Sequence, residues 1–96
     1  MTAPDIEESM LARVVTIARG TSADVKDQTE ANVLRMASML VRSRYPLEAA
    51  RLMTICDAYF RRFPNDKLPA EDILRNGWVT SLPRLRAMLE VQLQRP

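Results

Sequence analysis

The side chains that most enzymes use for catalysis are scarce in this chain of 96 residues. It contains no histidine and a single cysteine, Cys56, which lies in an apolar stretch. The common pairing of a nucleophile with a histidine base is therefore missing, and a zinc site would lack its nitrogen and sulfur ligands. The two glycines are too far apart to form a phosphate-binding loop. We therefore expect neither catalysis nor a metal ion nor a cofactor.

The clustered carboxylates have an explanation that requires no chemistry. One cluster is Asp5, Glu7 and Glu8, and another is Glu71 with Asp72. Each cluster stands where a helix is expected to begin, and negative charge there interacts favourably with the helix dipole. Both clusters are therefore interpreted as structural.

Arginine is the most abundant charged side chain in this sequence. All but two of the fourteen basic residues are arginine, and the formal net charge is +2. Residues 1–40 carry four basic and six acidic side chains (net −2), whereas residues 41–96 carry ten basic and six acidic ones (net +4). Because arginine favours bidentate pairing and partial burial, this distribution suits a protein interface as well as phosphate contacts.

The elements that position these side chains are expected to be helices. Hydrophobic residues make up 47% of the chain, and its length fits one domain over residues 1–96. Apolar residues recur at helical spacing in five segments. Four of them are residues 4–19, 46–63, 69–76 and 82–94, and the other begins near Asp27 or Thr29 and leads into the turn at Pro46. The sequence therefore predicts an all-α fold, a small single-domain bundle of four or five helices with a central antiparallel αα-hairpin.

Residues at the expected helix ends support this division. Gly20 and Gly77 follow the first and fourth segments, as glycine commonly does after the last helical turn. Asp27 precedes Glu30 at the spacing of a capping box, and either Thr80 or Ser81 can cap the fifth segment.

Residues 33–64 read as two helices joined by a tight turn at Pro46, and they resemble a tetratricopeptide repeat. Aligned on the pair Glu48-Ala49, the small contact positions of that family fall on Ala37, Ala49 and Cys56. Its large positions fall on Val33, Met36, Leu40 and Met53. Small side chains at the crossing allow two helices to approach closely. A generic αα-hairpin in a helical bundle is the alternative interpretation.

The hairpin also departs from the family pattern. Val33 and Leu40 occupy positions where the family has aromatic residues, and Pro64 comes about one helical turn late. The resemblance covers about a third of the chain, without a second copy. It implies a degenerate helical repeat that binds a peptide or helix, and among short proteins it is similar to small bacterial type III secretion chaperones.

These observations favour a chaperone-like or adaptor-like module that binds an amphipathic helix of a partner protein in an apolar groove. Methionine adapts to varied partners, and arginine could supply contacts at the rim of the groove. The partner would be another protein or a second copy of the chain. The expected partner-binding residues are Met36, Met39, Leu40, Arg42, Arg44, Arg51 and Met53.

A small DNA-binding regulator is the alternative function. Residues 73–81 have the helix and glycine turn of a helix-turn-helix, which would place Arg84 and Arg86 near the start of a recognition helix. Pro83 in the first turn and the modest net charge argue against it. The sequence has no evident secretory signal and no apolar run long enough for a membrane span, so a cytoplasmic location is expected.

Overall fold

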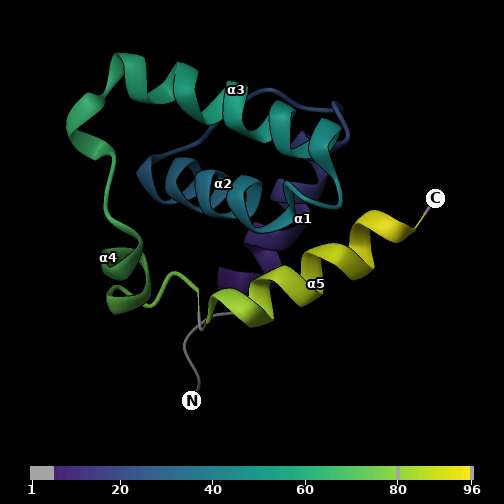
Figure 1. Cartoon of the computed structure of the whole chain (residues 1–96). Helices are drawn as coiled ribbons and strands as arrows, with labels where there is room; N and C mark the ends of the chain where they lie inside the picture. Colours follow the sequence, from purple (N-terminus) through teal and green to yellow (C-terminus); the bar gives the residue numbers. More distant parts are fainter. Residues whose placement is uncertain (1–5, 80, 96) are drawn as a thin grey trace.

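The computed structural model describes residues 6–79 and 81–95, and within them the chain is helical and contains no strand. Figure 1 shows the helices in chain order. They are α1 (Ile6–Ala18), α2 (Gln28–Val41), α3 (Pro46–Arg62), the 3₁₀ turn η1 (Pro64–Asp66), α4 (Ala70–Arg75) and α5 (Leu82–Gln94). The expected all-α fold is therefore confirmed, and η1 is the one element that the sequence pattern did not predict.

The bounds of these helices follow from local interactions at their ends. Asp27 caps α2, because its side chain accepts a hydrogen bond from the Glu30 backbone N–H at 2.9 Å. Ser81 caps α5 in the same way, while Thr80 lies outside the described residues. Gly20 and Gly77 have positive φ angles of 79° and 72°, the left-handed conformation in which only glycine is unstrained. The predicted stops of α1 and α4 are thus confirmed.

Helix α2 lies at the centre of the fold. It packs against α1, α3, α4 and α5, and it runs in the opposite direction to α3, its closest neighbour (Figure 1). The small residues Ala37, Ala49 and Cys56 are all buried, as close helix packing requires. The Ser38 hydroxyl crosses this contact and donates to the Ala49 carbonyl at 2.8 Å. The expected central hairpin is therefore present.

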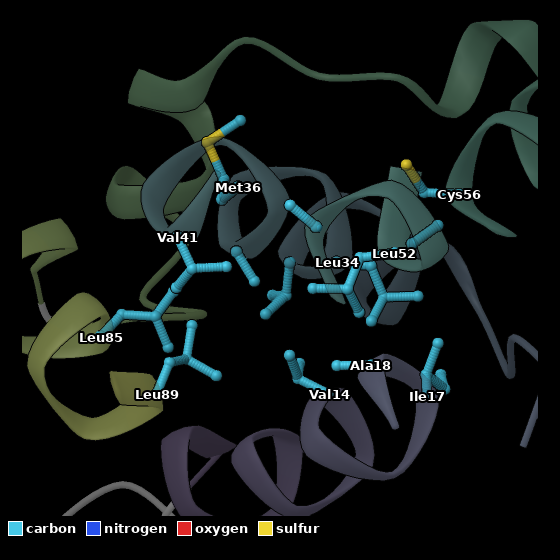
Figure 2. Close-up of a cluster of buried hydrophobic side chains, with 14 of the residues drawn as sticks. Val14, Ile17, Ala18, Leu34, Met36, Val41, Leu52, Cys56, Leu85 and Leu89 are labelled. Atoms are coloured by element: carbon cyan, nitrogen blue, oxygen red, sulfur yellow. The ribbon is translucent and has the colours of Figure 1, made fainter. Parts of the chain in front are cut away.

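The apolar core forms where α1 and α5 close over the hairpin. Figure 2 shows Val14 and Ile17 of α1 directed towards the α2–α3 hairpin, with Leu85 and Leu89 of α5 entering from the side. Helix α4 contributes Ile73 to the same buried cluster. Burial of these side chains removes apolar surface from water and is the main force that holds the helices together.

Candidate functional site

The residues expected to form a groove on the α2–α3 hairpin do not lie on one surface. Met36 is only 5% exposed and belongs to the core, whereas Met39, less than one turn further along α2, is 57% exposed. Met53 is partly buried beside Cys56, with 3.8 Å between the two sulfur atoms. Leu40 faces α5 and lines a groove there. The structure therefore does not bring these apolar side chains together.

The three arginines expected at the rim are dispersed as well. Arg51 turns towards the end of α1 and donates to the Ala18 carbonyl at 3.0 Å, so it satisfies a helix C-terminus. Arg44 reaches across to Glu90 of α5. Arg42 is exposed. Of the three, Arg44 is the one that joins Leu40 beside α5.

The segment proposed as a helix-turn-helix has a different geometry. Helix α4 packs against α2, and α4 with α5 is not among the closely packed helix pairs of the described residues. Six residues, 76–81, separate the two helices, whereas the motif normally has a turn of about three or four residues. Arg86 pairs with Glu90 one turn further along α5, and the Arg84 backbone N–H bonds to the Ser81 cap. This arrangement does not present α5 as a recognition helix braced by α4.

Helix α5 instead displays a second apolar face that the sequence analysis missed. Leu85 and Leu89 are buried, but Pro83, Ala87 and Val91 are exposed on another side of the same helix, and Val91 retains 52% of its surface. The spacing of i, i+4 and i+8 places these three in one line. That spacing was the available sequence signal, and the stronger leucine stripe of α5 obscured it.

A groove runs along each side of this line. The groove between α1 and α5 has a volume of about 560 Å³ and is lined by Leu11, Ala12, Ala87, Met88, Val91 and Gln92. The groove between α2 and α5 has a volume of about 390 Å³ and is lined by Leu40, Leu82, Pro83, Arg86, Ala87 and Glu90. Ala87 borders both grooves and forms the low ridge between them. We call the line Pro83, Ala87 and Val91, together with the two grooves, the α5 face.

Another apolar groove, of about 300 Å³, lies between α3 and the connection that follows α1. The exposed Leu47 stands at its edge, and its lining includes Gly20 and Ala50. Its volume is smaller than that of either groove of the α5 face, and opposite α3 its lining comes mostly from a non-helical connection. We therefore regard the α5 face as the principal candidate.

Charged side chains surround the groove between α2 and α5. A terminal nitrogen of Arg44 lies 3.5 Å from Oε1 of Glu90, and Nε of Arg86 lies 3.7 Å from Oε2. At the other end of the face, Arg19 donates to the Gln92 carbonyl at 2.7 Å and also to the Arg95 carbonyl. Arg19 thus ties the end of α5 to α1.

A buried ion pair fixes the α1 wall of the site. Arg13 donates to both carboxylate oxygens of Glu30, at 3.1 and 3.0 Å, and the same guanidinium bonds to the Asp24 carbonyl. The Lys26 backbone N–H also donates to Oε1 of Glu30, at 2.9 Å. Burial by itself would raise the pKa of Glu30, but the hydrogen bonds from Arg13 and Lys26 together outweigh it and lower the pKa. Glu30 therefore stays ionised and holds α1 on α2.

A second buried polar network holds the chain between α3 and α4. The Asn32 side chain donates to the Asp66 carbonyl at 2.8 Å and accepts from the Leu68 N–H at 3.0 Å. Arg35 donates to the Leu68 carbonyl as well. Asn32 and Arg35 of α2 thus hold the segment around Asp66 and Leu68 against the helix.

The single cysteine, Cys56, is poorly placed to act as a nucleophile. Cys56 is fully buried, and burial raises the pKa of its thiol to about 11, so the reactive thiolate does not form near neutral pH. Burial and the hydrogen bond to Asp66 similarly raise the pKa of Tyr59 to about 12. Neither Cys56 nor Tyr59 lines the grooves of the α5 face.

Within residues 6–79 and 81–95 the structure groups no three potential metal ligands, and no helix there has the length and hydrophobicity that crossing a bilayer requires. Comparisons with protein-family models, with curated proteins and with solved structures give no match to this chain.

Proposed function

We propose that this protein is a small interaction module, chaperone-like or adaptor-like, that binds an amphipathic helix of a partner protein against the α5 face. The observation that carries the proposal is the exposed line of Pro83, Ala87 and Val91 on a helix whose opposite side already fills the core. A helix that serves only its own fold needs one apolar face. The second face of α5 provides the surface for a further helix.

The shape of the α5 face suits such a ligand. Two helices pack with axes about 8–10 Å apart when small residues lie at their contact. Ala87, at the ridge, permits this approach, and the grooves on either side can receive the larger side chains of the incoming helix. The same surface would accept a helix from another protein or from a second copy of this chain.

The proposed binding surface lies on α5, next to the α2–α3 surface that was predicted from the sequence. Leu40 and Arg44 remain part of it, because both lie beside α5. Met36 is removed from it, because its side chain is needed in the core. The proposed class of function, capture of a partner helix in the cytoplasm, is unchanged.

Substitution of Ala87 by glutamate tests the proposal. A charged side chain on the ridge would block close helix approach and would place a desolvated carboxylate in the interface, so partner recovery should fall at least roughly tenfold. Ala58→Glu, at an exposed alanine of α3, is the matched control and should retain wild-type recovery. Recovery is measured by quantitative affinity purification from the native cell, and self-association by size-exclusion chromatography.

Circular dichroism verifies that both variants stay helical. The proposal fails if Ala87→Glu retains the partners and oligomeric state of the wild-type protein. It also fails if Ala58→Glu loses them to the same extent, because the effect would then not be specific to α5.

A further inference from the structure

We infer that the helix bound by the α5 face is acidic, and that Glu90 occupies, in the free protein, the place that a carboxylate of the partner takes in the complex. The inference rests on the proposed function and specifies the chemistry of the partner. Its evidence is the geometry of Arg44, Arg86 and Glu90 at the edge of the groove between α2 and α5.

The two arginines hold Glu90 only loosely. Their nitrogens lie 3.5 and 3.7 Å from its carboxylate oxygens, whereas a strong charge-assisted hydrogen bond measures about 2.7–2.9 Å. The Arg44 and Arg86 side chains remain 56% and 51% exposed, so both are accessible to a ligand. The arginine side of this ion-pair cluster can therefore gain from a better-placed carboxylate.

The charge around the α5 face complements an acidic ligand. From Leu82 to Arg95 the charged residues are Arg84, Arg86, Glu90 and Arg95, which gives three cations and one anion. Arg44 adds a fourth cation from the end of α2. The capped N-terminus of α5 contributes a partial positive charge beside Pro83. The carboxylates of an acidic helix would meet these cations along α5 and beside the groove between α2 and α5, and the apolar ridge favours a peptide over a nucleic acid.

Exchange of carboxylates would make the surface selective. When an acidic helix docks, its carboxylates bind Arg44 and Arg86, and its apolar side chains cover the grooves and exclude water. Electrostatic interactions strengthen when water is excluded. Until then, Glu90 neutralises part of the positive charge and competes for the two guanidiniums. Removal of its charge should therefore increase the affinity for an acidic helix.

The test uses three fluorescein-labelled synthetic helices with the same leucine and alanine face and with glutamate, glutamine or lysine at the flanking positions. Fluorescence anisotropy measures their binding to the full chain at low and at high salt. The glutamate peptide should bind best and the lysine peptide worst, and the preference should shrink as salt screens the charges. A labelled DNA duplex is titrated in parallel.

Variants of the ion-pair cluster then assign the preference to named residues. Glu90→Gln should increase the affinity for the glutamate peptide roughly threefold, which corresponds to the contribution of a modest surface ion pair. Asp57→Asn, which makes the same charge change at an exposed site on α3, should not. The double reversal Arg44→Glu with Arg86→Glu should weaken the glutamate peptide at least roughly tenfold and favour the lysine peptide. Arg61→Glu with Arg62→Glu is its matched control.

The outcomes separate this inference from the function on which it rests. Equal binding of all three peptides, lost on Ala87→Glu, would keep the helix-binding function and overturn the acidic partner. Failure of every peptide to bind would overturn both. Binding of DNA but not of peptides, lost in the Arg44 and Arg86 reversal, would overturn the inference in favour of phosphate recognition.

Discussion

Removal of either partner of the Arg13–Glu30 ion pair should destabilise the protein, and the two losses should be unequal. Glu30 is buried, with 1% of its side chain exposed, whereas 32% of the Arg13 side chain reaches solvent. An arginine left alone can still be hydrated in part. A carboxylate left alone at this site cannot. Arg13→Ala should therefore cost more stability than Glu30→Ala.

The magnitudes follow from the bonds that each change removes. Glu30→Ala removes the two hydrogen bonds from Arg13 and the one from Lys26, and should cost about 2–3 kcal/mol. Arg13→Ala leaves a buried charge without its counter-ion, a change that typically costs about 3–5 kcal/mol. A chain of this length has a total stability on the order of 5–15 kcal/mol. Either loss is thus a large part of the total.

The dependence on pH distinguishes the two states of Glu30. In the wild-type protein the pKa of Glu30 is lowered from 4.5, so its contribution is present above that value and is lost as pH falls through the folded pKa. In Arg13→Ala, burial becomes the dominant influence and should raise the pKa of Glu30 above its unfolded value. The carboxyl group then protonates as pH falls from neutral, and the destabilisation of this variant relative to the wild-type protein should shrink.

Urea denaturation followed by far-ultraviolet circular dichroism, repeated from pH 7 down to the acid range, measures both effects. The double variant Arg13→Ala with Glu30→Ala serves as the control, because it should cost less than the sum of the single changes. Equal losses for the two single variants, with the same pH dependence, would refute the idea that Glu30 is held ionised by Arg13.

Met36→Glu should unfold the chain or cost several kcal/mol, on the order of 3 or more, because it buries a charge. Met39→Glu, at an exposed site of the same helix, should stay within about 0.5 kcal/mol, and thermal melts compare the pair directly. Asn32→Ala should cost about 2 kcal/mol, because it leaves the Leu68 N–H without its partner and removes the shorter of the two hydrogen bonds to the Asp66 carbonyl. Limited proteolysis should then cut residues 64–69 sooner, and an unchanged cleavage rate would contradict that role.

The parts of the fold that sequence reasoning predicted depend on local signals. Asp27, Ser81 and the two glycines act within one helical turn, so the starts of α2 and α5 and the ends of α1 and α4 could be placed from the chain alone. The small residues of the hairpin likewise report a contact between helices that are adjacent in sequence. The short turn η1 gave no comparable signal.

The location of the binding surface could not be predicted in this way, because it depends on which helix covers which face. Met36 lies one turn beyond Asn32, on the side of α2 where residues 66–75 attach. The sequence shows that Met36 is apolar, but it does not show that this segment returns to cover it. The outward face of α5 is similarly defined by the position of α1 and α2 on either side. Both features depend on tertiary packing, which the pattern within one helix does not show.

The central position of α2 has a consequence for synthesis of the protein. The core residues of α1 and α2 are covered on one side by α5 with Leu85 and Leu89, which follow them by tens of residues in the chain. Until residues 82–94 have been synthesised, the nascent chain exposes that apolar surface, and such incomplete chains aggregate readily. A protein proposed to cover the apolar face of a partner helix would thus itself expose an uncovered apolar surface during translation.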